Sequence, residues 1–292
     1  MNGLLLIDKP AGPTSHDVVD KVRDVLKERK IGHAGTLDPQ ATGLLLLALG
    51  DATRWLEFLP GDKRYSATLR LGVETDTEDI WGKVLKESDP AALSGIADEA
   101  IREALESVKR SGVQVPPMVS ALKHQGKPLY EWARQGKEIE RKARPVEIHS
   151  IQIGERRGNE LDIEVHCGSG TYVRSLCAEA GRVLGCGAAM AALRRTAVGP
   201  FRVEDAVAPD RAAEGRLLGA SEALGHLKEF RVPEGSEKAL CSGQDLGLEG
   251  PAWTESDTWR LCAQDGALLA LGRPQQVSGA WRMRPKKVFA AR

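Results

Sequence analysis

The sequence predicts a mixed α/β (α+β) fold whose main sheet is largely antiparallel. Apolar and polar residues alternate along residues 64–71 and again along residues 161–167, the period of a strand with one buried face. Isolated helical patterns separate these strands, without a regular alternation of strand and helix. Because a parallel sheet needs that alternation, the pattern favours antiparallel strands with helices packed against them.

The N-terminal elements begin with an apolar run and a helix-capping signal. Residues 3–7 predict a buried strand, and Thr14 followed three positions later by Asp17 resembles a capping box. Apolar residues at helical spacing then predict a helix that runs to about Lys27. The continuous apolar run of residues 44–49, bordered by glycines, predicts a core strand.

Two further helices are expected in the middle of the chain. One covers about residues 96–108, and another begins near Thr171, directly after the second alternating strand. Between them lies a stretch rich in proline and lysine, residues 114–145.

The end of the chain has a different pattern from the rest. Regular periodicity is lost near residues 230–236, and short alternating apolar pieces follow. We therefore expect one domain over residues 1–231 and a small all-β domain over residues 237–292. At about 55–60 residues, the second is near the lower size limit for an independent core.

The charges are balanced in total but unevenly distributed. The chain has 41 basic and 41 acidic residues, so its formal net charge is zero. Residues 74–106 carry a net charge of −7, whereas residues 266–292 carry six basic residues and no acidic one. Residues 120–150 add seven basic residues against four acidic ones. A basic face that attracts a phosphate backbone is compatible with this pattern, although a charge run alone is more often solvated surface.

Cysteine spacing and hydropathy restrict the class of protein. The five cysteines include no CxxC pair, which argues against a disulfide framework and against a zinc site. The N-terminus lacks the basic region of a signal peptide, and the longest apolar run is far shorter than the ~20 residues that span a bilayer. We expect a cytoplasmic protein, and nothing in the sequence predicts more than a monomer.

The segment with the strongest chemical signal is residues 32–43, in which three glycines surround Asp38 and Pro39. Glycine lets a backbone approach a ligand closely, and Pro39 restricts Asp38 to extended conformations. This would hold one carboxylate between a helix and a core strand. The alternative is an ordinary Asp-Pro turn. Neither GxxxxGK[ST] nor GxGxxG occurs here, so a phosphate-binding loop is not indicated.

Several short motifs occur along the chain. The longest is Gly-His-Ala-Gly-Thr-Leu-Asp-Pro-Gln-Ala-Thr-Gly-Leu-Leu, residues 32–45. The shorter ones are Asp-Lys-Pro-Ala-Gly-Pro-Thr-Ser (8–15), Asp-Lys-Arg-Tyr (62–65), Gln-Val-Pro-Pro-Met (114–118), Gly-Thr-Tyr-Val-Arg (170–174) and Leu-Arg-Arg-Thr (193–196). These motifs resemble, in the same order, those of the TruB-type tRNA pseudouridine synthases, and the resemblance covers about residues 3–201.

This resemblance implies the pseudouridine synthase fold, with a thumb-loop insertion at about residues 112–145 and a PUA-like RNA-binding domain over residues 237–292. It also implies an isomerase that converts the uridine at tRNA position 55, in the T loop, to pseudouridine after flipping the base out. The reaction transfers no group to or from the RNA and involves no net redox change. We therefore expect no cofactor and no metal, and a tRNA T stem-loop rather than a membrane as the partner.

The resemblance assigns the catalytic carboxylate to Asp38. It would either attack the sugar covalently or remove a ribose proton to give a glycal-like intermediate, and the sequence leaves both routes open. Arg174 occupies the position of the family's cation, and such a neighbour keeps a partly buried carboxylate ionised. Without the flanking motif, Arg174 would be interpreted as a surface or phosphate-binding arginine.

Four other residues are expected around the target base. The resemblance implies that Tyr65 stacks on it, that Tyr172 and Leu193 line its pocket, and that His33 fills the space left by the extruded nucleotide. Each also has an ordinary interpretation, as a strand or core residue or as a structural loop histidine.

The sequence departs from the family pattern at two positions. Val119 stands where an aromatic residue is usual, which concerns thumb packing, and Ser169 stands where lysine is common, which concerns one phosphate contact.

Two other functions are compatible with parts of the sequence. A non-catalytic RNA-binding protein or tRNA chaperone on the same fold would not need Asp38, Tyr65 and Arg174 together, yet all three are present. A glycosidase would need a pair of carboxylates, and the pocket motifs hold one acidic residue.

Overall fold

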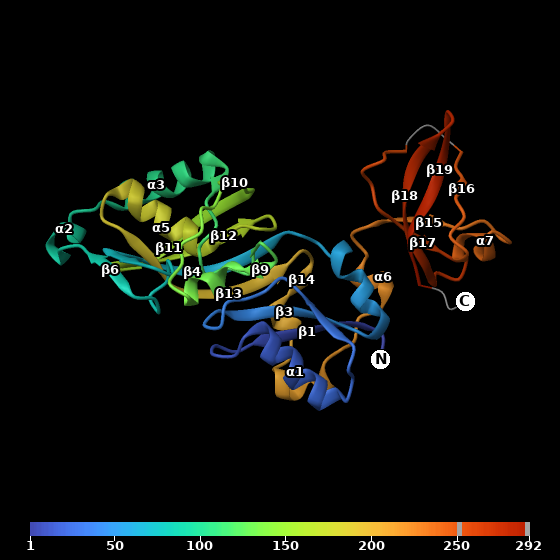
Figure 1. The fold of residues 1–292 in the computed structure, drawn as a ribbon, viewed down its shortest axis with the longest axis horizontal. Coiled ribbons are helices and arrows are strands. Elements are labelled where there is room, and N and C mark those ends of the chain that lie inside the picture. Colours follow the sequence, from blue (N-terminus) through green and yellow to red (C-terminus); the bar gives the residue numbers. More distant parts are fainter. Residues whose placement is uncertain (250–252, 290–292) are drawn as a thin grey trace.

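The structure is a computed structural model that describes residues 1–249 and 253–289. Its main feature is an eight-stranded sheet in the order β1-β3-β13-β4-β12-β11, with β2 paired to β3 and β14 paired to β13 (Figure 1). The strands are β1 (Gly3–Lys9), β2 (Ile31–Ala34), β3 (Thr42–Leu49), β4 (Lys63–Leu71), β11 (Ile148–Arg157), β12 (Glu160–Cys167), β13 (Ala188–Val198) and β14 (Phe201–Arg202). Among these described strands only β3 and β13 pair in parallel, so the predicted mixed, largely antiparallel sheet is confirmed.

The N-terminal elements follow the sequence pattern. The first predicted strand is β1, the apolar run forms most of β3, and the predicted helix is α1 (Ser15–Leu26) with the Thr14–Asp17 capping box in place. Val18 and Val22 of α1 pack with the leucines of β1 and β3 in one core cluster. The 3₁₀ helix η3 (Pro209–Glu214) contributes Ala212 to the same cluster.

Residues 32–43 lie between the predicted helix and the predicted core strand, and their first residues belong to a strand that the sequence analysis did not predict, β2 (residues 31–34), paired with β3. A four-residue strand leaves little periodic signal in a sequence. After β3, the chain forms the 3₁₀ helix η1 (Gly50–Phe58).

At the other end of the sheet, two helices cover one face of β4, β12 and β11. They are α3 (Asp98–Ser111) and α5 (Val173–Leu184), whose apolar side chains join the core with Leu69 and Ile163. Both predicted helices are thus confirmed. Next to them lie the helix α2 (Pro90–Ser94) and the hairpin of β5 (Val73–Thr75) and β6 (Val84–Glu87).

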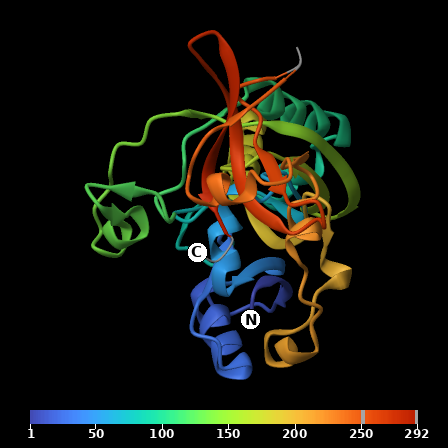
Figure 2. The same ribbon diagram turned by 90° about the vertical axis from the view of Figure 1, so that its right-hand side faces the viewer.

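A long insertion extends from this half of the molecule, and Figure 2 shows it as the green segment that projects from the body. Its base is closed by β7 (Val113–Gln114) paired with β10 (Arg144–Pro145). Between them lie β8 (Lys123–His124), β9 (Lys127–Pro128) and α4 (Leu129–Arg134). We call residues 115–143 the thumb.

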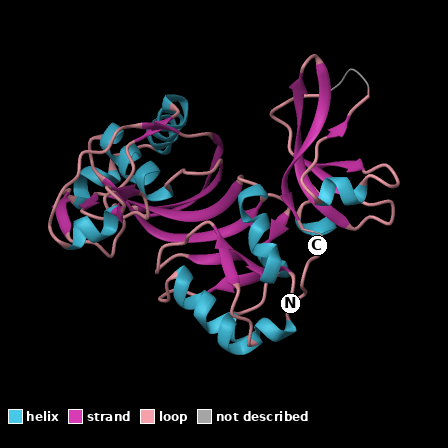
Figure 3. Ribbon diagram, turned by 45° about the vertical axis from the view of Figure 1, so that its right-hand side comes forward, coloured by secondary structure: helices cyan, strands magenta, loops and turns pink. Residues whose placement is uncertain are grey.

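The C-terminal part is a separate five-stranded sheet, set apart from the main sheet in Figures 1 and 3. Its order is β15-β17-β18-β19-β16, made of β15 (Lys228–Arg231), β16 (Leu246–Gly247), β17 (Trp259–Cys262), β18 (Leu268–Val277) and β19 (Ala280–Val288). This sheet begins before residues 237–292, the range expected from the sequence, because β15 pairs with β17. The short helix α7 (Glu237–Cys241) belongs to this part.

Two short elements, η2 (Val203–Asp205) and α6 (Ala220–Ala223), lie between the two sheets in the chain. The C-terminal sheet contacts the main body at η1, where the Phe289 and Trp55 rings meet edge to face with centroids 6.4 Å apart. Lys287 and Glu57 form an ion pair at the same contact. Among the described residues, no helix is long and apolar enough to cross a membrane.

Candidate active site

A cavity of about 690 Å³ lies between the segment after β2, the start of β4, the N-terminus of α5 and the thumb. Its lining includes all six residues that the sequence analysis assigned to the site: His33, Asp38, Tyr65, Tyr172, Arg174 and Leu193. They come from four segments that are far apart in the chain, and the sheet brings them together.

The side chain of Lys9 holds the loop that carries Asp38 in place. This side chain is fully buried, and its Nζ donates hydrogen bonds to the carbonyl oxygens of Pro39 (2.8 Å), Ala41 (2.7 Å) and Pro10 (2.9 Å). Burial lowers the pKa of Lys9 to about 8, although the negative charge of Asp38 acts in the opposite direction. Lys9 therefore holds the backbone on the C-terminal side of Asp38.

The return of this loop to the sheet requires glycine at position 43. Gly43 has a φ of +100°, and a Cβ atom there would lie 2.3 Å from the carbonyl oxygen of Arg195. A side chain would thus clash with the backbone of β13. Gly35, in the same segment, also has a positive φ, of 76°.

Asp38 is paired with Arg174. The Nε of Arg174 donates to Oδ2 of Asp38 at 2.8 Å, and Nη2 donates to Oδ1 at 3.1 Å, a two-point contact that fixes the plane of the carboxylate. The Arg174 side chain is 2% exposed, whereas that of Asp38 is 37% exposed. The carboxylate therefore faces the cavity, and the cation lies behind it.

The remaining donors of Arg174 bind main-chain carbonyls of two other segments. Nη1 donates to the oxygen of Thr77 at 2.7 Å, and Nη2 donates to the oxygen of Val119 in the thumb at 2.9 Å. The departure from the family pattern at Val119 does not affect this contact, because the contact is made by the backbone.

Tyr65 forms part of the cavity wall next to Arg195, a residue that the sequence pattern did not single out. Arg195 lies across from Tyr65 in the pairing of β13 with β4 and is fully buried. It donates to the carbonyl oxygens of Leu44 (2.6 Å) and Gly35 (2.9 Å), while its Nη1 makes no hydrogen bond within the described residues. Burial raises the pKa of Tyr65, and Arg195 acts against that rise.

In the sequence, Arg195 stands out only as one of two adjacent arginines inside a mainly apolar strand, β13. Its side-chain direction could not be read from the sequence, because β13 is irregular between Met190 and Ala192 and again after Arg195. Such irregularities change which face a residue occupies.

The other predicted residues occupy different parts of the wall. His33 lies on β2; burial lowers the pKa of its imidazole, and its buried Nδ1 makes no hydrogen bond within the described residues. Tyr172 precedes α5, and its backbone is bound to the side chain of Gln114 through two hydrogen bonds, of 2.9 and 3.1 Å. Leu193 is a partly buried residue of β13.

Ser169, the second departure from the family pattern, lies at the rim of the cavity. Its hydroxyl accepts a hydrogen bond from Nζ of Lys63 at 3.3 Å and donates one to the carbonyl oxygen of Gly61 at 3.1 Å. Lys63 also lines the cavity, so an ammonium group is present beside Ser169. Within the described residues, no group of three metal-binding side chains lines this cavity.

Comparison with known proteins identifies the family. Residues 23–173 match the model of the TruB family pseudouridylate synthase N-terminal domain, and residues 174–213 match the tRNA pseudouridylate synthase B C-terminal domain. The chain belongs to the TruB family. Both models end before the C-terminal sheet, which lies outside their matches.

Individual TruB relatives are similar over nearly the whole chain. A tRNA pseudouridine synthase B from Heliobacterium modesticaldum is 42% identical, covering 99% of this chain and 96% of the relative. One from Geotalea uraniireducens is 46% identical, covering 97% and 94%. A solved structure described as a Cbf5-Nop10-Gar1 complex superposes with a TM-score of 0.75 at 27% identity, covering 99% of this chain and 85% of that one. The protein is thus an enzyme that isomerises uridine in tRNA to pseudouridine.

Proposed function

We propose that Asp38 is the catalytic carboxylate and that the substrate is the uridine at position 55 in the T loop of tRNA. The observation that carries this proposal is the Asp38–Arg174 pair, which presents one fixed carboxylate to a cavity of about 690 Å³. A single carboxylate is the group that breaking and remaking one glycosidic bond on the same ribose requires.

The reaction breaks the bond from N1 of uracil to C1′, turns the base, joins C5 to C1′, and moves the proton of C5 to the base nitrogen. Asp38 serves it by covalent attack or by removing a ribose proton, and both routes place the carboxylate beside the ribose. Arg174 keeps that carboxylate charged and oriented. A base inside a folded T loop has to be flipped out to reach this position, which costs a few kcal/mol.

The other cavity residues hold the flipped nucleotide. Tyr65 stacks on the uracil, Tyr172 and Leu193 complete the wall, and His33 occupies the space that the nucleotide leaves. A neutral, buried phenol at Tyr65 suits an uncharged base, since its raised pKa keeps the hydroxyl protonated.

The C-terminal sheet is the proposed PUA-like, RNA-binding unit, with its boundary between Leu227 and Lys228. Arg282, Arg284 and Lys286 are exposed residues of β19, and Arg284 forms an ion pair with Asp245, so Arg282 and Lys286 give the exposed face of this strand its basic character. Such a face attracts phosphates away from the target base. We place the enzyme in the cytoplasm. In this proposal it acts as a monomer, because one copy of the chain holds all the residues of the cavity.

Primer extension after carbodiimide treatment tests this function. The protein is incubated with an unmodified tRNA transcript, with a transcript in which the T-loop uridine is replaced by cytidine, and with the Asp38→Asn variant. We expect one pseudouridine stop, in the T loop, that appears only with the wild-type protein and the uridine transcript. A stop at another uridine would reject the T-loop assignment, and a stop formed by Asp38→Asn would reject the catalytic residue.

A further inference from the structure

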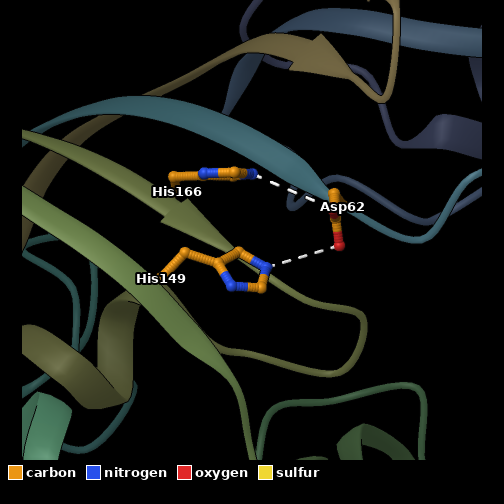
Figure 4. A group of neighbouring side chains, drawn as sticks. All are labelled: Asp62, His149 and His166. Carbon is orange, nitrogen blue, oxygen red and sulfur yellow. Dashed lines mark hydrogen bonds and ion pairs between the residues drawn. The ribbon is translucent and has the colours of Figure 1, made fainter.

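Two histidines and an aspartate converge outside the cavity. They are Asp62, His149 and His166, whose candidate ligand atoms all lie within 4.8 Å of one another (Figure 4). Nε2 of His149 is 3.4 Å from Oδ1 of Asp62, and Nε2 of His166 is 4.0 Å from Oδ2. Over residues 1–249 and 253–289, this is the one group of three such side chains.

The sheet places these side chains together on the face that the helices do not cover. Asp62 directly precedes β4, His166 lies near the end of β12, and His149 lies at the start of β11, and these strands are neighbours in the order β4-β12-β11. Val165 and Cys167, on either side of His166, point into the core, so His166 points away from it.

A β-bulge brings His149 to the same place. Ile148 pairs with Cys167 and Ser150 pairs with His166, which leaves His149 as an extra residue with no partner of its own on β12. Bulges of this kind re-aim a side chain relative to the regular alternation of a strand. Here the bulge brings the imidazole of His149 to 4.4 Å from that of His166, measured between ring centroids.

A second carboxylate lies beside His149. Oε1 of Glu147 lies 3.5 Å from Nδ1 of His149, while Nε2 of the same ring faces Asp62. Histidines that bind metal through one ring nitrogen commonly have a carboxylate beside the other, and Glu147 lies in that place. The Asp62 side chain is 57% exposed and both imidazoles are about one quarter exposed, so an ion has access.

We propose that Asp62, His149 and His166 form a binding site for a divalent transition metal ion, with Zn²⁺ as the fitting ion. Two imidazole nitrogens and one carboxylate oxygen are ligands that Zn²⁺ binds at about 2.0–2.2 Å, with a fourth position left for water. At those bond lengths tetrahedral ligand atoms lie about 3.3–3.6 Å apart. The 3.4 Å distance from His149 to Oδ1 of Asp62 lies in this range. The 4.0 Å distance from His166 runs to the other oxygen, Oδ2, so metal binding requires a rotation of the Asp62 or His166 side chain.

The surrounding charges permit a cation. Asp62 and Glu147 supply two negative charges, and Arg64, which pairs with His166 across the two strands, supplies one positive charge.

A bound ion would connect β11 and β12 to the wall of the cavity. Asp62 lies between Gly61 and Lys63, and both of these line the cavity. The site is structural in this proposal, and no step of uridine isomerisation passes through it. Its expected effect is therefore on stability, since an ion that binds only the folded chain raises its melting temperature.

The test uses full-length protein without an affinity tag, treated with EDTA and then dialysed. Zn²⁺ is added in a calorimetric titration, and Co²⁺ is added while its visible absorption is recorded. We expect one equivalent of each ion to bind saturably and Zn²⁺ to raise the melting temperature. In His149→Gln and His166→Gln, the affinity should fall at least tenfold and the temperature shift should disappear. The controls are His16→Gln, an exposed histidine of α1, and Cys241→Ser, a partly exposed thiol; both should bind as the wild type does.

Asp62→Ala separates loss of the site from loss of the fold, because this side chain is largely exposed. It should lose Zn²⁺ binding while its melting temperature without metal stays at the wild-type value. The proposal is overturned if the wild type shows no saturable site for either ion. It is equally overturned if Asp62→Ala or the two histidine variants bind Zn²⁺ with wild-type affinity, since the ion would then be bound elsewhere.

Discussion

Arg174 and Asp38 are 136 positions apart in the chain, yet they share two hydrogen bonds, of 2.8 and 3.1 Å. The same guanidinium binds the carbonyl oxygens of Thr77 and Val119, so one buried side chain connects four segments of the protein. This geometry makes Arg174 the residue whose replacement has the most specific expected outcome.

Arg174→Lys should lower kcat/KM by about 10²-fold or more, because a misplacement of the catalytic carboxylate by about 1 Å costs on that order. A lysine ammonium can neither make the two-point contact in the plane of the Asp38 carboxylate nor also bind both carbonyl oxygens that Arg174 binds. The measurement is steady-state kinetics on unmodified tRNA. The matched control is Arg182→Lys. Arg182 is an exposed residue of the same helix and forms an ion pair with Glu179, so its replacement should leave the kinetics at wild-type values. Wild-type kinetics in Arg174→Lys would remove it as the partner of Asp38.

Asp38→Asn should lower kcat by about 10³-fold or more while the tRNA dissociation constant changes little, since the carboxylate acts in the chemical step. Single-turnover kinetics and a filter-binding titration measure the two quantities separately. Asp24→Asn, a residue of α1 far from the cavity lining, serves as the control. Retention of more than a few per cent of the wild-type kcat would be incompatible with the assignment.

Lys9→Met should destabilise the protein by at least about 2 kcal/mol, because three carbonyl oxygens would be left without their donor. The cost should also depend on pH. The folded pKa of Lys9, about 8, lies below its ordinary value of 10.5, so the unfolded chain binds more protons between these two values. The contribution of Lys9 to the free energy of unfolding therefore rises as the pH rises from about 8 to 10.5.

Urea denaturation of wild type and Lys9→Met at about pH 7, 8.5 and 10 checks this sign. The difference between the two free energies of unfolding should grow with pH, whereas the exposed Lys21→Met should show a small difference that is independent of pH. A difference that shrinks with pH would show that Lys9 is not held in the environment described.

Removal of the C-terminal sheet should weaken tRNA binding and leave the chemistry intact. The truncated chain should end after Leu227, because a cut at Glu237 would leave β15 without β17. We expect a higher KM and a kcat within a few-fold of the intact enzyme. The salt dependence of binding should become flatter by about 0.9 in log–log slope for every phosphate that the sheet no longer neutralises.

Truncation also uncovers Trp55, so a full-length variant is the sharper test. Arg282→Gln with Lys286→Gln removes two positive charges of β19 and should flatten the slope without changing the fold. Lys83→Gln is the control for a general loss of positive charge, because Lys83 lies in the net acidic stretch of residues 74–106. An unchanged slope in the β19 variant would exclude this face from the RNA interface.

The sequence predicted the elements that carry strong local signals. The apolar run of β3, the capping box of α1 and the alternation in β4 and β12 each appear in the structure within a few residues of the expected bounds. Their patterns depend on burial of one face, which is a local property of the chain.

Other features depend on contacts between distant segments and leave no local pattern. Arg195 is turned inward by an irregular strand, and the contact of Val119 with Arg174 is made by a backbone oxygen. The expected absence of a zinc site rested on cysteine spacing. Asp62, His149 and His166 meet only because three strands are neighbours and one of them is bulged, so no spacing rule could reveal them.

The contact of Arg174 with Val119 has a consequence for how this enzyme can be altered. Every amino acid has the carbonyl oxygen that Arg174 binds there, so the thumb can exchange its side chains without disturbing the charge network behind Asp38. Chimeras in which residues 115–143 come from a relative would then change which RNAs are held while the isomerisation itself continues. Substrate range and chemistry can diverge independently in such a protein, because they are joined through a group that mutation does not remove.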